Sequence, residues 1–163
     1  MSIRILNSLS KQKEELVPLK GKKINMYSCG VTVYDECHIG HARSLYIFDV
    51  IRRYLKYRKY DVHFVRNITD IDDKIINRAK ELGQNSDEVA NRNIDSYYRD
   101  LKALGIDKAD VEPRATQNIA DMIKDIEGLI KKDFAYVVDG DVYYNVRKFK
   151  SYGKLSGQSI DSL

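Results

Sequence analysis

The sequence predicts an α/β fold with a parallel sheet, and three observations support this. An apolar strand over residues 22–30 leads through a short loop into a helix over residues 41–59. A second apolar strand covers residues 61–67. Two strands that flank a helix form a right-handed βαβ unit with parallel strands. The carboxyl ends of both strands are where a ligand is expected to bind.

The other elements are predicted from the spacing of apolar residues and from residues that cap or end helices. Residues 3–8 are predicted to form a short strand, and residues 11–23 a charged connection. A helix with Asp70, Asp72 and Asp73 in its first turn is expected to stop at Gly83, and the next helix is expected to begin after Ser86 and to end at Gly105. Thr116 is expected to cap a further helix. Four sets of residues are expected to face the interior: Leu45, Phe48, Ile51 and Leu55; Ile71, Ile75, Ala79 and Leu82; Ala90, Ile94, Tyr97, Leu101 and Leu104; Ile119, Met122, Ile123, Ile126 and Ile130.

The chain ends on a predicted β-hairpin and an irregular segment. Residues 135–138 and 142–146 flank the turn formers Asp139 and Gly140. Residues 148–163 show no strong period. Because two parallel strands make only half of a nucleotide-binding sheet, we expect the chain to be truncated.

Size and composition limit the function classes. The 163 residues suffice for one core, and a net charge of +4 permits an anionic partner such as RNA. Two cysteines cannot build a disulfide framework, and neither a signal peptide nor a membrane span is visible. We therefore expect a cytoplasmic protein that does not enter membranes. The basic stretch 52–59 is interpreted first as a solvated helix face and second as a nucleic-acid contact.

A tetrapeptide, His38-Ile39-Gly40-His41, joins the first strand to the first long helix. A helix start stabilises phosphate oxygens, imidazoles add donors, and a glycine lets a base or ribose approach the backbone. Both histidines could instead cap the helix or bind a metal. The glycine-rich motifs of dinucleotide folds and P-loops are missing from the sequence, so ATP binding is the favoured interpretation.

The ends of the two predicted strands bring a second group of residues together. Cys29 and Gly30 are expected beside Asn67, Thr69 and Asp70. Asp72 and Asp73 are interpreted as stabilising the following helix start. Cys37 is interpreted as a small buried hydrophobe, and His63 as a structural histidine without a catalytic role.

Five segments together resemble bacterial cysteinyl-tRNA synthetases: residues 26–35 (MYSCGVTVYD), 38–43 (HIGHAR), 67–75 (NITDIDDKI), 112–116 (EPRAT) and 152–156 (YGKLS). The resemblance covers essentially all of the chain and about the first third of such an enzyme. It implies a class I synthetase catalytic domain with a Rossmann-like sheet, a helical insertion and a β-hairpin near the end. Residues 1–110 would form the first half of the nucleotide-binding fold, and residues 111–163 the start of the connecting insertion, with later domains absent.

The resemblance also implies substrates and cofactors. ATP and L-cysteine would give cysteinyl adenylate, whose acyl group passes to tRNA(Cys), and the enzyme would be a monomer. One zinc ion would recognise the substrate thiol, with Cys29 as its first ligand and the others outside this chain. Magnesium would accompany ATP. Zinc suits this task because it prefers sulfur, whereas shape alone separates cysteine from serine by only about 1–3 kcal/mol.

Residue roles carry over by position. His38 and His41 would bind ATP and stabilise the pentacoordinate phosphorus, and Gly40 would admit the adenosine. Gly30 and Thr32 would line the cysteine pocket, and Thr69 would approach the substrate from the second strand.

Other functions stay open at this point. A ligase of the mycothiol type would join cysteine to a small amine by the same adenylation, and a non-catalytic nucleotide-binding fragment is a third reading. A nucleotidyltransferase with a similar histidine pair is more distant. We expect the 163-residue chain alone to have negligible adenylation activity and to bind zinc weakly.

Overall fold

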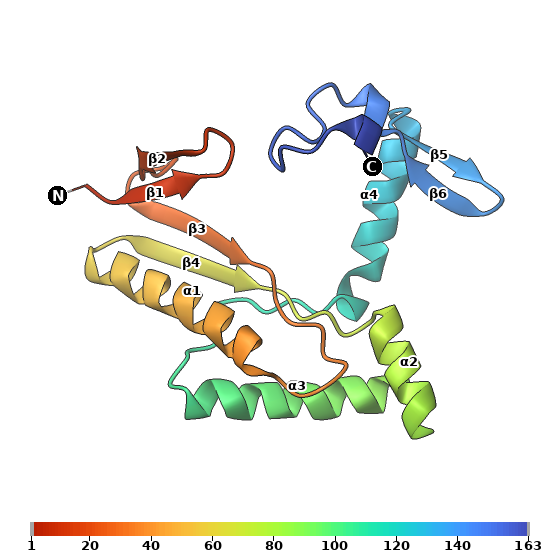
Figure 1. Cartoon of the computed structure of the whole chain (residues 1–163), viewed down its shortest axis with the longest axis horizontal. Coiled ribbons are helices and arrows are strands. Elements are labelled where there is room, and N and C mark those ends of the chain that lie inside the picture. The colour runs from red at the N-terminus through yellow and green to blue at the C-terminus, as the bar shows by residue number, and fades with distance from the viewer. Residues whose placement is uncertain (1, 163) are drawn as a thin grey trace. The chain divides into compact units, whose positions relative to one another are not determined.

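The computed structural model describes residues 2–162. The chain divides into two compact units, one formed by Pro18–Ile119 and the other by Met1–Val17 with Ala120–Leu163. Figure 1 shows the elements in chain order. The first of these units contains every residue of the predicted site.

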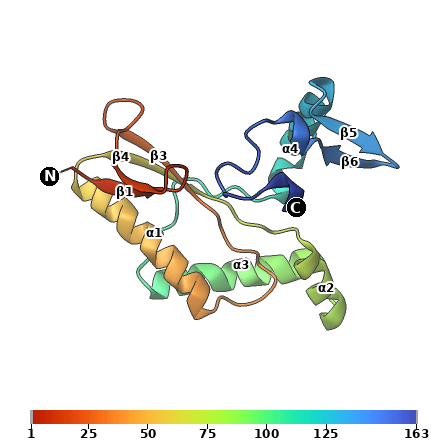
Figure 2. The same cartoon turned by 45° about the horizontal axis from the view of Figure 1, so that its top comes forward.

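The predicted βαβ unit is confirmed in the first unit. Strand β3 (Lys23–Ser28) and strand β4 (Asp61–Arg66) pair in parallel, from Lys23 opposite Asp61 to Ser28 opposite Arg66. The long helix α1 (Ile39–Tyr57) connects them (Figures 1 and 2). This helix starts two residues earlier than predicted, because His38 caps it.

The parallel pair gains a third member that the sequence did not predict. Residues 111–114 run along the free edge of β4, with parallel bridges from Val65 to Val111 and from Ile68 to Arg114. The Arg66 N–H donates to the Val111 carbonyl at 3.1 Å, and the Ile68 N–H donates to the Pro113 carbonyl at 2.9 Å. This segment is too short and too polar for a strand pattern, so its pairing is set by tertiary structure.

One face of this sheet is buried and the other is open. Val62, Phe64 and Arg66 alternate along the buried face, and α1 contacts β4 on this side, with the Arg52 guanidinium 5.6 Å from the centre of the Phe64 ring. The opposite face carries Tyr27 and His63, and both are exposed in the part of the chain described. His63 is therefore a surface residue of β4.

Two further helices complete the core of the first unit. Helix α2 (Asp73–Leu82) begins at Asp72, whose carboxylate accepts the Lys74 N–H at 2.9 Å, and it ends at Gly83 with φ +63°. The end at Gly83 and the structural role of Asp72 were predicted, but the helix begins later than expected, because Ile71 precedes its cap. Helix α3 (Ser86–Ala103) begins with a capping box formed by Asn85 and Glu88. The core contains Val31, Val33, Leu45, Ile68, Ile75, Ala79, Val89, Ala90, Ile94, Tyr97, Leu101 and Ile106.

Several predicted interior positions are wrong. Leu104, Ile51, Ile71 and Leu82 are exposed. Ile51 lies off the buried side of α1, which carries Leu45, Asp49, Arg52 and Leu55. Ile71 precedes α2, and Leu82 and Leu104 lie at helix ends. Thr116 does not cap a helix; it opens a short 3-10 helix (Thr116–Asn118) in which no side chain caps the start. Its hydroxyl donates instead to the buried Asp70 carboxylate at 2.6 Å, and its N–H donates to the same group at 3.0 Å.

The interpretation of the basic stretch as a solvated face is wrong for its first residue. Arg52 is buried and donates to the Lys108 carbonyl and to the Asp110 carboxylate. Arg53 donates to Asp49 at 2.6 Å and to Asp107 at 3.0 Å. These bonds raise the pKa of Arg53. The two arginines thus fix α1 to the connection that follows α3.

The second unit contains two hairpins and one helix. Strands β1 (Arg4–Asn7) and β2 (Gln12–Glu15) pair antiparallel, from Arg4 opposite Glu15 to Asn7 opposite Gln12. Strand β2 was predicted as a charged connection, because its sequence QKEE is polar throughout and all four residues are exposed. Backbone pairing alone makes it a strand.

The later part of this unit confirms the predicted C-terminal hairpin. Strands β5 (Ala135–Val138) and β6 (Asp141–Tyr144) pair through a turn in which Asp139 and Gly140 have φ of +51° and +92°. Two short 3-10 helices, Val146–Lys148 and Ile160–Ser162, follow. Helix α4 (Ile119–Lys131) precedes the hairpin, and none of its residues is buried. Its predicted inner face is therefore uncovered in the described structure.

No helix within residues 2–162 combines the length and the apolar character that crossing a membrane requires.

The buried ion pair between Arg66 and Glu112 holds the third sheet member in place. Their side chains are 1% and 9% exposed and lie 2.8 Å apart, and Tyr98 donates its hydroxyl to Glu112 at 2.8 Å. Burial, followed by this bond to Glu112, raises the pKa of Tyr98 to about 12. Glu112→Ala would leave the Arg66 cation buried without its partner, so we expect the free energy of unfolding to fall by about 3–5 kcal/mol in urea titrations.

The matched control is Glu81→Ala, which removes the exposed partner of Arg78. Its effect should stay below about 1 kcal/mol. Equal effects of the two substitutions would contradict a structural role for the buried pair.

Candidate functional site

The carboxyl ends of β3 and β4 bring three of the predicted substrate residues together. Beyond the last ladder pair, Thr32 forms a parallel bridge with Thr69. The Thr69 N–H donates to the Val31 carbonyl at 3.1 Å, and the Val33 N–H donates to the Thr69 carbonyl at 3.2 Å. Gly30 lies against Asn67 in the same place. The predicted meeting of the two strand ends is therefore confirmed.

Gly30 has a structural reason to be glycine. A Cβ atom built there would lie 1.5 Å from the backbone carbonyl oxygen of Asn67, which no arrangement of the present backbone permits. The Gly30 N–H donates to Asn67 Oδ1 at 2.8 Å. A role of Gly30 in lining a substrate pocket stays a prediction, whereas the close approach of the two chains is observed.

The two cysteines occupy different environments. Cys29 follows β3 directly and is exposed. Cys37 is half-buried against the core, as expected for a small hydrophobe, and burial followed by the Asp100 charge raises the pKa of its thiol.

The donor groups of residues 2–162 do not assemble into a zinc site. No three histidine, cysteine, aspartate or glutamate side chains in this part of the chain are grouped to hold a metal ion. Tetrahedral zinc needs three or four protein ligands, so these residues do not form a zinc site. Cys29 offers a single thiol at the strand end.

The first turn of α1 is organised by His38. Its Nδ1 accepts the Gly40 N–H at 3.0 Å, so the imidazole acts as the helix cap. A ring nitrogen that accepts carries no proton, and the proton of neutral His38 therefore lies on Nε2. The capping role that was considered as an alternative is thus observed. It leaves Nε2–H as a donor for an anion.

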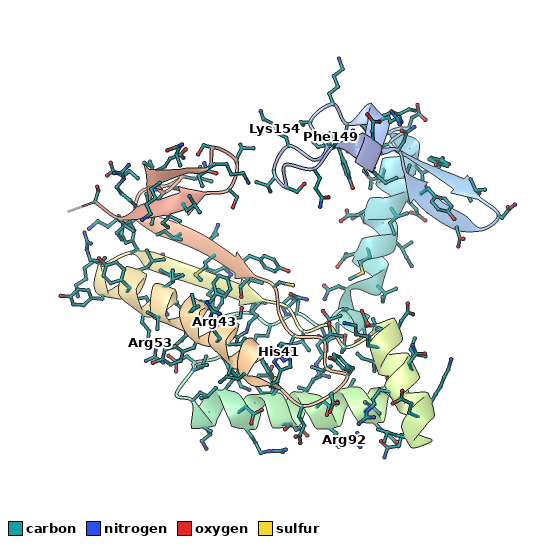
Figure 3. The ribbon with its side chains drawn as sticks, in the orientation of Figure 1. His41, Arg43, Arg53, Arg92, Phe149 and Lys154 are labelled. Atoms are coloured by element: carbon teal, nitrogen blue, oxygen red, sulfur yellow. The ribbon has the colours of Figure 1, made fainter. Side chains whose placement is uncertain are left out.

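His41 stacks on His38 one turn later, with ring centroids 4.0 Å apart and an interplanar angle of 22°. Figure 3 shows His41 at the start of α1. Burial, followed by the charge of His38, lowers the pKa of His41. Its Nδ1 is buried and has no hydrogen-bond partner among the described residues. His41 is therefore neutral at pH 7.

Gly40 lies beneath the His38 ring. A Cβ atom there would approach the His38 Cε1 and Nδ1 atoms to 2.7 and 2.9 Å. The glycine allows the imidazole to fold back over the helix start. Its predicted role in admitting adenosine is untested.

The segment 31–37 separates the strand-end residues from the imidazoles. It is held to α3 by the Asn93 side chain, which donates to the Val33 carbonyl at 3.1 Å. A cavity of 290 Å³ beside the helix start is lined by His38, Cys37, Ala42 and Leu104, among others. It is Cys37, not Cys29, that shares this cavity with His38. That the Cys29 sulfur and both imidazoles face one cleft stays a prediction.

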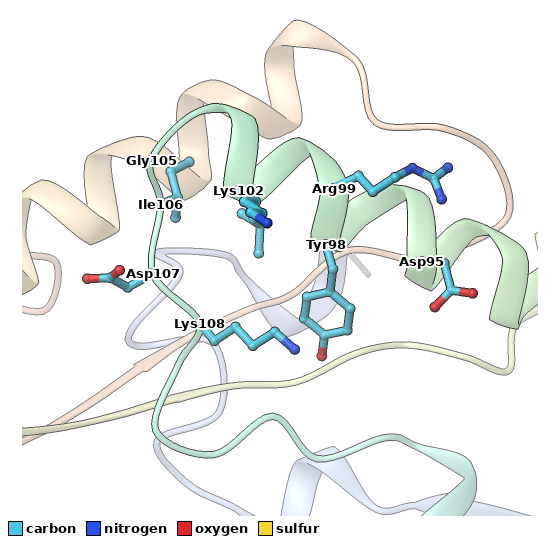
Figure 4. A pocket seen from close by; sticks show the side chains of 9 residues that line it. Asp95, Tyr98, Arg99, Lys102, Gly105, Ile106, Asp107 and Lys108 are labelled. Carbon is cyan, nitrogen blue, oxygen red and sulfur yellow. The ribbon is translucent and has the colours of Figure 1, made fainter.

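Other cavities lie in the same unit. A polar one of 340 Å³ at the end of β4 is lined by Asp70, Arg114 and Thr116, among others. Another, of 520 Å³, lies between the end of α3 and residues 105–108, where the Lys108 ammonium lies 3.8 Å from the centre of the Tyr98 ring (Figure 4). No predicted site residue lines this larger cavity.

The sequence alone assigned no role to Asn67 or Tyr27. Asn67 Oδ1 accepts the Tyr27 hydroxyl at 3.0 Å as well as the Gly30 N–H, and Asn67 Nδ2 donates to Thr69 Oγ1 at 3.2 Å. An asparagine directly after an apolar strand was the available signal. Its amide joins three residues of the candidate site.

Comparisons with known proteins show which family this chain resembles. The family model described as "tRNA synthetases class I (C) catalytic domain" matches residues 15–163. Relatives named "Cysteine--tRNA ligase" are 54% identical over 99% of this chain in Maridesulfovibrio salexigens, and 55% and 53% identical over 100% of it in Persephonella marina and Aquifex aeolicus. The chain spans only 33–34% of the length of these relatives.

A solved structure supports the fold independently. The methionyl-tRNA synthetase of Mycobacterium tuberculosis in complex with methionyl-adenylate matches with a TM-score of 0.60 and 20% identity, over 76% of this chain and 29% of that one. At this identity the match establishes the α/β architecture alone.

The contact between position 30 and Asn67 predicts a strong substitution effect. We expect Gly30→Ala to lower the free energy of unfolding by at least about 3 kcal/mol, because the strand ends must separate to admit a methyl group. Gly128→Ala in α4 is the control, since nothing lies within 4 Å of its Cβ position. It should stabilise the chain by up to about 1 kcal/mol. A Gly30→Ala variant as stable as the parent in urea would contradict this account.

The stacked imidazoles predict a titration. In NMR measurements of the ring Cε1–H signals, we expect His41 to titrate below its ordinary pKa of 6.5. His38→Asn keeps a capping side chain but removes one of the two causes. The His41 midpoint should then rise while staying below 6.5, because burial remains. A midpoint unchanged by His38→Asn would show that the neighbouring ring has no influence.

Proposed function

The chain belongs to the family of class I (C) tRNA synthetase catalytic domains, and we propose that it forms the amino-terminal part of the nucleotide-binding domain of a cysteine–tRNA ligase. The observation that carries this proposal is the 53–55% identity to proteins of that name over nearly the whole chain. Residues 1–110 would belong to the nucleotide-binding fold, and residues 111–163 to the insertion that follows.

In the proposed reaction, the carboxylate of cysteine attacks the α-phosphorus of ATP and pyrophosphate leaves. The cysteinyl group then passes to the 3′ ribose of tRNA(Cys). Most of the acceleration would come from alignment and from charge neutralisation, to which magnesium on ATP contributes.

The start of α1 suits contact with the triphosphate. The helix amino end has a partial positive charge, and the Nε2–H of His38 supplies a donor. Neutral His41 can become charged as negative charge develops on the phosphorus, because its pKa is lowered by burial and by His38. Gly40 would leave room for the adenosine.

The ends of β3 and β4 would bind the amino acid. Gly30 and Thr32 would line its pocket, and the Thr69 hydroxyl would reach it from the second strand. Zinc, when bound, would distinguish a thiol from a hydroxyl through its preference for sulfur, and Cys29 could supply one ligand.

The name of the relatives favours tRNA over a small amine as the acceptor. The protein would act as a cytoplasmic monomer on ATP, L-cysteine and tRNA(Cys).

A chimeric enzyme tests the proposal. This chain would replace the corresponding first third of the Aquifex aeolicus cysteine–tRNA ligase, to which it is 53% identical. We expect the chimera to charge tRNA(Cys) and to catalyse cysteine-dependent exchange of pyrophosphate into ATP. His41→Asn in the chimera should reduce this exchange by about 10²-fold or more, because a transition-state donor is lost.

The 163-residue chain alone is the matched control and should show negligible exchange. A folded chimera without activity, or a His41→Asn chimera with full activity, would contradict the proposal.

A further inference from the structure

The Asn67 side chain is the most connected polar group at the ends of the parallel strands. Its oxygen accepts the Gly30 N–H at 2.8 Å and the Tyr27 hydroxyl at 3.0 Å, and its amino group lies 3.2 Å from Thr69 Oγ1. One amide therefore touches both strands at the point where a ligand of a parallel sheet binds.

These contacts fix the orientation of the amide. A backbone N–H can only donate, so the Asn67 atom that faces Gly30 must be the oxygen. The amino group is then turned toward Thr69, where it must donate. The Thr69 hydroxyl consequently accepts this bond, and its own hydrogen is directed elsewhere.

The backbone around Thr69 leaves that hydrogen available. The Thr69 N–H and carbonyl are both engaged with the neighbouring segment, at Val31 and Val33. Thr69 is held in register with Thr32 by the bridge between them. Its hydroxyl is thus presented as a donor at the strand end, beside the turn that carries Cys29.

We propose that Asn67 is a positioning residue that sets the Thr69 hydroxyl as a hydrogen-bond donor to an acceptor group of the bound amino acid, while clamping the turn at Gly30. This proposal rests on the proposed function, because it assigns the amino acid to this end of the sheet. Asn67 itself need not touch the substrate.

Asn67→Asp separates the two tasks of the amide. A carboxylate still accepts from Gly30 and Tyr27, but it cannot donate to Thr69. The Thr69 hydroxyl would then donate to this carboxylate, in a charge-assisted bond, and its hydrogen would turn away from the substrate.

The measurement is pyrophosphate exchange by the chimera. We expect Asn67→Asp to raise the KM for cysteine about tenfold or more, with the KM for ATP unchanged and kcat reduced less than threefold. In a chimera that already carries Thr69→Val, which removes the hydroxyl, Asn67→Asp should raise the KM for cysteine no further. Repulsion between the new charge and the substrate would act with or without the hydroxyl, so a further rise in the Thr69→Val background would overturn the proposal.

Asn118→Asp is the matched control, because Asn118 donates its amide to the Arg114 carbonyl at 2.7 Å and has no contact to Thr69. It should leave the KM for cysteine within twofold of the parent. A merely structural Asn67 would lower the melting temperature of the Asn67→Asp chimera without changing that KM, which would overturn the proposal. An inactive parent chimera would instead count against the proposed function itself.

Discussion

The proposed amino-acid site depends on one close contact between two backbones at the end of the parallel sheet. The chain at Gly30 passes so near the Asn67 carbonyl that no side chain fits between them. The neighbouring residues of the site are positioned by this contact. The bridge between Thr32 and Thr69 continues the strand pairing beyond it, and Cys29 directly precedes Gly30. The amino-acid end of the proposed site is therefore built from backbone proximity more than from side-chain packing.

At the start of α1, by contrast, the backbone N–H donors are already partly used within the chain. Unpaired N–H groups at the helix start were expected to meet a phosphate, yet the Gly40 N–H donates to His38 Nδ1. An anion near this turn would meet the Nε2–H of His38 first. His41, stacked 4.0 Å behind it and neutral, adds no positive charge until charge develops nearby. The imidazole pair can therefore gain positive charge when an anion is present. Two permanent cations at this separation would repel each other.

The elements that the sequence predicted well are those whose apolar residues face a core. Strands β3 and β4 and helices α1, α2 and α3 have such patterns, and their order determines the parallel pairing. Strand β2 was missed because QKEE has no apolar residue, and only pairing with β1 defines it. The prediction that Arg52 is solvated was wrong, because the helical period alone cannot show that Asp110 lies on the facing segment. At the site, the residue types and their spacing predicted which residues meet at the strand ends. The hydrogen bonds of the Asn67 amide depend on three-dimensional distances, which sequence spacing does not give.

The segment 112–116 differs from the site residues, because its polar groups are used to hold the fold together. Glu112 neutralises the buried Arg66, the Pro113 carbonyl accepts the Ile68 N–H, and Thr116 donates twice to the buried Asp70 carboxylate. The fold therefore uses four polar groups of this segment, and each of these contacts holds the chain along β4 and the residues that follow it. By contrast, the Thr69 hydroxyl accepts from Asn67 and His38 Nδ1 accepts from Gly40, so each of these side chains keeps one donor of its own. These two donors remain for the proposed chemistry, and they lie at the ends of β3 and β4 and at the start of α1.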